Sequence, residues 1–251
     1  MKNKLFQLMA LNKGAGSFKL ETSGDEATLW LYDMIVDSDV TAEWWGGVSA
    51  ESLVKELRGL SASTIHIRIN SPGGDVFAAR TIEQAIREHS ATVIAHVDGY
   101  AASAASLVSS ACDQVIMAPG SFIMIHKAWT IAIGNADDLM GTADLLEKID
   151  GTIAQSYENK AGDAGKDTDF GALMAAETWL TPEEAVAVGL ADEVASSGPK
   201  ASAQPRWNMS AYQHAPTPVN DVEEPKPAPE KPAAEKIDHR ARSLRLIAQA
   251  A

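Results

Sequence analysis

Hydrophobic and polar residues between positions 20 and 197 follow two periods in turn, one typical of strands and one typical of helices. In TIHIRI (64–69) every second residue is isoleucine, which predicts a strand with one buried face. In VFAARTIEQAIREH (76–89) the apolar residues return at helical spacing. The same patterns predict further strands at 27–36, 92–97, 114–118 and 122–126, and further helices at 49–60, 101–111 and 135–160. Because strands and helices alternate, we expect an α/β fold with a mostly parallel sheet.

Proline marks the end of this patterned region. Three of the 11 prolines precede residue 198 and eight follow it. The stretch 198–235 is rich in proline, alanine and charge, so we expect a disordered linker. Residues 236–251 fit a short amphipathic helix that docks on a partner, and they fit a frayed, solvated end equally well. The chain thus divides into an N-terminal extension (1–24), one domain (25–197) and this tail.

Composition narrows the classes of function. A formal net charge of −13 argues against a nucleic-acid partner. The single cysteine, Cys112, cannot form a disulfide within the chain, and its apolar neighbours favour a packed side chain over a reactive thiol. The apolar run at 5–11 is too short and polar for a signal peptide, and no run approaches the length of a membrane span. We therefore expect a cytoplasmic protein that binds no membrane.

The first stretch that could form part of a binding or catalytic site is INSPGGDV, at a predicted strand-to-helix junction. Gly73 and Gly74 follow Pro72, so the turn can adopt positive φ and approach a ligand closely. Amides at such a junction favour a phosphate, a carboxylate or a developing oxyanion. The spacing matches neither GxxxxGK[ST] nor GxGxxG. On its own, SPGG is also a common tight turn, and Asp75 fits the cap of the following helix.

The second stretch is GYAASAAS (99–106). Its small residues either let two backbones pack closely or leave room for a substrate beside a nucleophilic serine. Ser103 is expected in the first turn of a helix that begins at the carboxyl edge of the sheet, where helix amides stabilise an alkoxide or oxyanion. Ser106 lies one turn further on, where packing or a hydrogen bond to a carbonyl is expected.

A nucleophilic serine needs a base, and the chain has six histidines. His126 ends the apolar strand FIMI and leaves the core where the chain turns. A lone histidine there is more often structural, and it is the combination with Ser103 that favours catalysis. The other five fall mid-strand, at a helix end or in the tail, where structural or surface roles are expected: His66, His96, His89, His214 and His239.

Four motifs in fixed order carry a family resemblance: INSPGGDV, GYAAS, MIHK and LTPEEAVAVGLADEV (180–194). Together they resemble the proteolytic subunit of the Clp protease, and most closely the Clp-like head maturation proteases of phages and prophages. The resemblance covers about residues 25–196. It implies a crotonase-like spiral of ββα units with a long handle helix at 135–160, and it implies serine endopeptidase activity without a cofactor or metal.

The resemblance also implies partners. Family members form homo-oligomeric rings, which here means a heptamer or stacked rings joined through the handle. The substrates would be polypeptides, including capsid and scaffold proteins during prohead maturation. Whether a Clp-type ATPase feeds substrates into the ring is left open by the resemblance. The tail is not part of the housekeeping enzyme's pattern, so we expect it to tether the protease to capsid or scaffold proteins.

Residue by residue, the resemblance implies that Ser103 is the nucleophile and His126 the general base. It implies an oxyanion hole made by Gly73, Gly74 and the amide of Ala104. The third triad member falls on Glu177, where the family usually has aspartate, with the alternatives Asp167 and Asp169 nearby.

Lys127 invites a Ser-Lys dyad as an alternative. Neighbouring residues on a strand point to opposite faces, so His126 and Lys127 should not both reach the serine. Two other functions remain open: an acyl-coenzyme A enzyme of the crotonase-like fold, and an inactive capsid-assembly protein. The pair of Ser103 and His126 argues against both.

Overall fold

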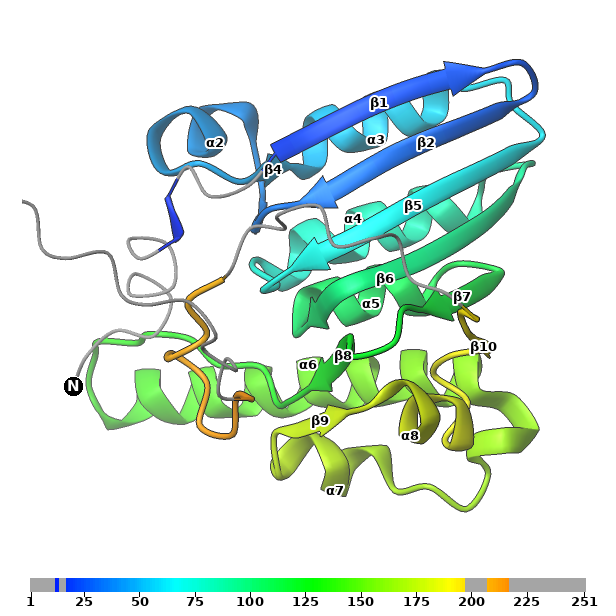
Figure 1. Cartoon of the computed structure of the whole chain (residues 1–251). Helices are drawn as coiled ribbons and strands as arrows, with labels where there is room; N and C mark the ends of the chain where they lie inside the picture. Colours follow the sequence, from blue (N-terminus) through cyan, green and yellow to red (C-terminus); the bar gives the residue numbers. More distant parts are fainter. Residues whose placement is uncertain (1–11, 14–16, 197–206, 217–251) are drawn as a thin grey trace, which may run out of the picture. The chain divides into compact units, whose positions relative to one another are not determined.

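A computed structural model describes residues 12–13, 17–196 and 207–216 (Figure 1). Within these residues, the central sheet has eight strands in the order β1-β2-β5-β6-β7-β10, with β8 and β9 added beside β6. The strands are β1 (Ser17–Ser23), β2 (Glu26–Tyr32), β5 (Thr64–Ser71), β6 (Thr92–Ala102), β7 (Gln114–Met117), β8 (Phe122–Ile125), β9 (Thr178–Leu180) and β10 (Glu193–Val194), and a separate parallel pair is β3 (Ile35–Val36) and β4 (Val48–Ser49). The helices are α2 (Asp39–Trp45), α3 (Ala50–Gly59), α4 (Val76–Arg87), α5 (Ala104–Ser110), α6 (Ala136–Ala161), the 3₁₀ turn η1 (Gly162–Gly165), α7 (Phe170–Ala175) and α8 (Pro182–Ala187).

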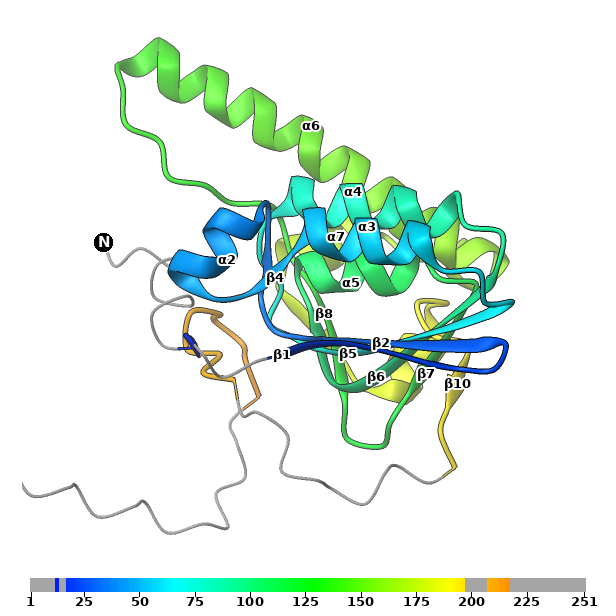
Figure 2. The same ribbon diagram turned by 90° about the horizontal axis from the view of Figure 1, so that it is seen from above.

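The sheet is parallel across its centre. Strands β2, β5, β6 and β7 pair in parallel, whereas the outer strand β1 runs antiparallel to β2 and β9 runs antiparallel to β8. Figure 2 shows α3, α4 and α5 together on one face of this sheet. The predicted α/β fold is therefore confirmed.

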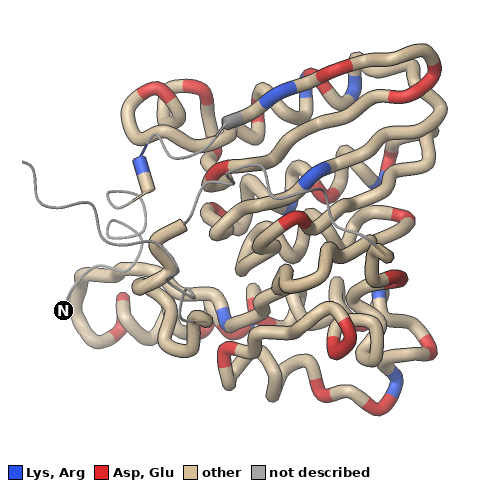
Figure 3. Tube along the Cα trace, in the orientation of Figure 1, with Lys and Arg blue, Asp and Glu red and all other residues tan. Residues whose placement is uncertain are grey.

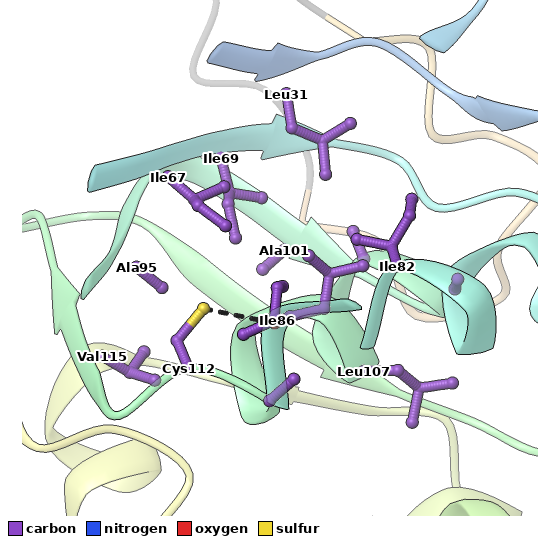
Figure 4. Close-up of a cluster of buried hydrophobic side chains, with 14 of the residues drawn as sticks. Leu31, Ile67, Ile69, Ile82, Ile86, Ala95, Ala101, Leu107, Cys112 and Val115 are labelled. Atoms are coloured by element: carbon purple, nitrogen blue, oxygen red, sulfur yellow. Dashed lines mark hydrogen bonds between the residues drawn. The ribbon is translucent and has the colours of Figure 1, made fainter. Parts of the chain in front are cut away.

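The buried face of the sheet follows the alternation in the sequence. Ile65, Ile67 and Ile69 of β5 are all buried and pack toward the helices, as Figure 4 shows for the last two. Cys112 lies in the same cluster, and burial raises the pKa of its thiol to about 12. A thiol that stays protonated is a packing group, in line with the expectation for this residue.

Strand β6 changes partner along its length. Its first part pairs with β7 between Ile94 and Val97, and its last part pairs with β8 between Tyr100 and Ala102. The sequence patterns predicted a strand ending at residue 97 and a helix from 101; the structure instead continues the strand to Ala102 and begins α5 at Ala104. Because β8 pairs with this extension, the end of β8 lies beside the end of β6.

Two boundaries of the sequence analysis need correction. The strand predicted at 27–36 divides into β2 and β3, because the Asp33 carboxylate accepts a hydrogen bond from the Met34 amide (2.7 Å) and turns the chain. The extension assigned to residues 1–24 contains β1, whose residues Ser17–Ser23 pair along the whole of β2. Its polar and apolar residues alternate over only a few positions, which makes such an edge strand hard to detect.

The linker expected at 198–235 is not disordered throughout. Residues 207–216 pack on the domain, and Trp207, Met209 and Tyr212 are buried against Met34, Ala102 and Met124. Averaged over a long window, the proline-rich composition hides this short aromatic stretch. The helix expected at 236–251 lies outside the described residues. No helix in the described part of the chain is long and apolar enough to cross a membrane.

Candidate active site

Ser103 occupies a sharp turn between β6 and α5. Its backbone has φ 53° and ψ −124°, a conformation that non-glycine residues rarely adopt. The turn is fixed from both sides, because the Ser103 amide donates to the carbonyl of Met124 on β8 (2.8 Å) and the Ser106 amide donates to the carbonyl of Ser103 (2.9 Å). Backbone strain held in this way is common where a side chain must be presented to a ligand.

His126 follows β8 directly and meets Ser103. The Ser103 Oγ and the His126 Nε2 lie 2.6 Å apart, within hydrogen-bonding distance. The two residues are 23 positions apart in the chain, and they meet because β8 pairs with the last residues of β6. The structure thus brings together the two side chains that the sequence analysis singled out as nucleophile and base.

The glycine turn lies against the beginning of α5. Gly73 has φ 94°, and a Cβ built on it would lie 2.6 Å from the carbonyl oxygen of Ala102 and 3.1 Å from the amide nitrogen of Ala104. Only a glycine allows this approach. The Gly73 amide donates to the Ser71 hydroxyl (3.2 Å). The three residues expected to form an oxyanion hole, Gly73, Gly74 and Ala104, therefore surround the same turn as Ser103.

Glu177 directly precedes β9, and His126 directly follows β8. Strand β9 pairs antiparallel with β8, and the pairing ends where Thr178 lies opposite Ile125. Glu177 is, with Ser103, one of two non-glycine residues of positive φ in the described part of the chain. Its Oε1 accepts a hydrogen bond from the amide of His214 (2.7 Å).

The other candidate residues have partners away from the serine. Asp169 caps α7 by accepting from the Ala172 amide (2.9 Å), and Asp167 is exposed. The ammonium of Lys127 lies 3.9 Å from the carboxylate of Asp150 on α6, as expected for a side chain on the opposite face from His126.

A cavity of about 430 Å³ opens beside Ser103 and His126. It lies between the beginning of α4, α5, the segment after His126 and α6. Most of its lining is apolar: Val76, Phe77, Leu107, Trp129, Ile131, Leu145, Leu146, Ile149 and Ile153, with Gly74, Ala104 and Tyr212 close to the serine. A chamber of this kind suits an apolar side chain of a bound ligand.

Tyr212 is the residue at this site that the sequence analysis missed. Its ring meets the His126 ring edge to face (centroids 5.5 Å apart), and its hydroxyl donates to the carbonyl of Pro72 (2.5 Å). Burial raises the pKa of the Tyr212 hydroxyl, and a hydrogen bond with the Ser103 side chain opposes that rise. The one available signal was WNMSAY, an aromatic cluster inside a proline-rich tail.

The contact between Ser103 Oγ and His126 Nε2, beside backbone amides, resembles the arrangement that serine hydrolases use. The family model described as Clp protease matches residues 38–198, and the chain belongs to that family. The resemblance of the four motifs to the Clp protease family is thereby confirmed at the level of the family.

Curated relatives agree with this family. The chain is 34% identical over 135 residues to the ATP-dependent Clp protease proteolytic subunit of Bacteroides fragilis, which covers 52% of this chain and 63% of the relative. It is 32% identical over 158 residues to the ATP-dependent Clp protease proteolytic subunit 2 of Treponema denticola, covering 59% of this chain and 76% of the relative. It is 32% identical over 156 residues to the corresponding subunit of Deinococcus radiodurans, covering 58% and 73%. The match thus spans less than two thirds of the Bacteroides fragilis relative.

Proposed function

We propose that this protein is a serine endopeptidase that cleaves peptide bonds with Ser103 as nucleophile and His126 as general base. The observation that carries the proposal is the 2.6 Å contact between Ser103 Oγ and His126 Nε2 beside a cavity of about 430 Å³. Glu177 is proposed to orient His126, which the register of β8 and β9 supports. A glutamate can serve in place of aspartate at the cost of one more rotatable bond.

In the proposed reaction, His126 Nε2 takes the proton of Ser103 as Oγ attacks the carbonyl carbon of the substrate. The carbonyl oxygen becomes an oxyanion, which the amides of the Gly73-Gly74 turn and of Ala104 are proposed to stabilise. His126 then gives its proton to the leaving amine, and an acyl-enzyme remains. Water, deprotonated by the same histidine, attacks the acyl carbon and releases the acid and the free serine.

The biological setting is proposed from the sequence motifs. Their likeness to phage head maturation proteases supports capsid and scaffold polypeptides as substrates, and the long chain after the domain supports a tether to them. The exposed apolar side chains of Leu139 and Met140 on α6 support ring assembly through this helix. Co-expression with capsid and scaffold proteins tests the setting: processed capsid protein is expected with the full chain and not with Ser103→Ala, and unprocessed capsid with both would contradict it.

A fluorophosphonate probe tests the chemistry. An active serine bonds to the phosphorus and fluoride leaves, so labelling requires a nucleophilic hydroxyl. We expect covalent labelling of the full chain that disappears in Ser103→Ala, with the modified peptide located by mass spectrometry. A variant with Tyr212→Ala, which removes the side chain in contact with Ser103 and His126, is labelled in parallel. Absence of Ser103-dependent labelling in both proteins would favour an acyl-coenzyme A enzyme or an inactive assembly protein.

A further inference from the structure

Residues 207–216, which we call the covering segment, return from the end of the domain to the candidate site (orange in Figure 1). The segment reads WNMSAYQHAP and holds no Asp, Glu, Lys or Arg, so it is tan throughout in Figure 3. Trp207, Met209 and Ala211 are buried, while Asn208 and Ser210 between them are exposed. The segment therefore docks by an alternating apolar face.

The beginning of the segment is anchored away from the reacting atoms. The indole Nε1 of Trp207 donates to the carbonyl of Asn70 at the end of β5 (3.0 Å). The backbone of Asn208 makes two hydrogen bonds with the side chain of Asn12, donating from its amide (2.7 Å) and accepting at its carbonyl (3.1 Å). These contacts hold the segment at the edge of the sheet where β5 and β6 end.

Tyr212 then reaches the serine, the histidine and the glycine turn together. Its hydroxyl donates to the carbonyl of Pro72, directly before the glycine pair, and its ring lies on His126. It also packs edge to face against Trp179 of β9 (centroids 5.9 Å apart). The side chain lines the cavity beside Ser103 and His126.

The end of the segment engages the proposed acid. The amide of His214 donates to Glu177 Oε1 (2.7 Å), and the His214 Nδ1 lies 3.1 Å from the carbonyl of Ala176. One short segment thus contacts the proposed nucleophile, base and acid and the turn beside the oxyanion hole. The group it brings to Ser103 is a phenol, which has no carbonyl carbon for the serine to attack.

We propose that the covering segment is an intramolecular inhibitor of the peptidase site. This inference rests on the proposed function. A substrate and Tyr212 compete for the same space, so the site reacts only in the fraction of molecules in which the segment has left it. The segment belongs to the chain itself, and its release is therefore a step at which activity can be controlled.

The rate of fluorophosphonate labelling at Ser103 tests this proposal in the full chain. We compare the wild type with Tyr212→Ala and Trp207→Ala. Trp207 contacts the end of β5 and none of the reacting atoms, so its removal acts only by loosening the segment. Both variants are expected to be labelled at least about tenfold faster than the wild type. Trp44→Ala is the matched control, because this tryptophan on α2 is 69% exposed, and its rate should equal that of the wild type.

A synthetic peptide with the sequence of residues 207–216 supplies the reverse test. Added to Tyr212→Ala, it is expected to slow labelling in a concentration-dependent way, and a peptide carrying Tyr212→Ala is not. If either alanine variant fails to fold by circular dichroism, Tyr212→Phe keeps the ring, removes the hydroxyl that contacts Pro72 and Ser103, and should give a smaller increase in rate.

The outcomes separate the two proposals. Equal labelling rates in the wild type, Tyr212→Ala and Trp207→Ala would overturn the inhibitory segment while leaving Ser103 an active nucleophile. Slower labelling in Tyr212→Ala would also overturn it, because Tyr212 would then support the reaction. Absence of labelling in every protein would instead contradict the proposed function on which the inference rests.

Discussion

Ser103 and Ser106 lie one helical turn apart and have different surroundings. Ser103 holds a strained backbone conformation and meets a histidine, whereas Ser106 is fully buried. The Ser106 hydroxyl donates to the carbonyl of Ser103 (2.5 Å), so the hydroxyl of Tyr157, 2.7 Å away, must donate to Ser106. The second serine supports the turn that carries the first.

Replacement of Ser106 by alanine should therefore affect stability more than chemistry. The change leaves the Tyr157 hydroxyl buried without its acceptor, which costs about 1–3 kcal/mol. We expect a lower urea midpoint with an unchanged slope, while fluorophosphonate labelling at Ser103 persists. Complete loss of labelling in a folded Ser106→Ala protein would contradict the supporting role.

Gly74 tests how tightly the turn is packed. It has φ 152°, and a Cβ there would lie 2.0 Å from the carbonyl oxygen of Ile35. Gly74→Ala should lower the free energy of unfolding by about 2–5 kcal/mol, since backbone strain and overpacking add. Gly24→Ala is the control: Gly24 also has positive φ, but no atom lies within 4 Å of the added Cβ, so the loss should be about 1–2 kcal/mol. Equal losses in the free energy of unfolding for the two variants would show that the contact with Ile35 contributes nothing to the cost of Gly74→Ala.

At the scale of elements, neighbouring strands place polar groups on the face of the sheet opposite the main core. The His66 Nδ1 and the His96 Nε2 lie 2.9 Å apart on β5 and β6. Beside them Arg68 forms an ion pair with Asp98, which also accepts from the Tyr32 hydroxyl (2.6 Å). Burial, and then the nearby charges of Arg68 and His66, lower the pKa of His96 from 6.5 to about 4.

This depressed pKa makes stability depend on pH. The folded protein keeps His96 neutral, whereas the unfolded chain binds a proton near pH 6.5, so stability falls as the pH drops from above 6.5 toward 4. The free energy of unfolding is measured with urea at about pH 7.5 and about pH 5. Its decrease between the two pH values should be smaller for His96→Gln than for the wild type. Asp98 titrates in both proteins and cancels in the comparison. An identical loss in the two proteins would contradict the assignment.

At the scale of the whole molecule, the long helix α6 has two different halves. Its C-terminal part is buried at Ile153, Tyr157 and Ala161, whereas Leu139 and Met140 near its beginning are 46% and 58% exposed. Exposed apolar side chains on a projecting helix suit contact with another copy of the chain. The proposed ring assembly would bury them.

Negative charges introduced at Leu139 and Met140 should therefore weaken ring assembly and leave the fold of the single chain intact. The double variant Leu139→Glu and Met140→Glu is expected to lower the mass in native mass spectrometry, because the new carboxylates would be desolvated in the contact. Val40→Glu on α2, where the valine is 65% exposed, is the control and should keep the wild-type mass. An unchanged mass in the double variant would exclude this half of α6 from the assembly.

The sequence predicted the fold and the pair at the site better than it predicted what surrounds them. Ser103 was expected in the first turn of a helix and His126 at the end of a clear strand, and the family resemblance implied their roles as nucleophile and base. The continuation of β6 to Ala102 escaped prediction because its partner β8 is needed to define it. Tyr212 escaped because its contact with Pro72 spans 140 residues, and local composition carries no information on such a distance.

The only cysteine of the chain offers a practical benefit. Cys112 is buried, its thiol stays protonated well above neutral pH, and thiol reagents attack the thiolate. A cysteine introduced at an exposed position would therefore react selectively without removal of the native one. Gln213 is exposed next to Tyr212, and a fluorophore attached there would record the proposed release of the neighbouring tyrosine from Ser103 in real time.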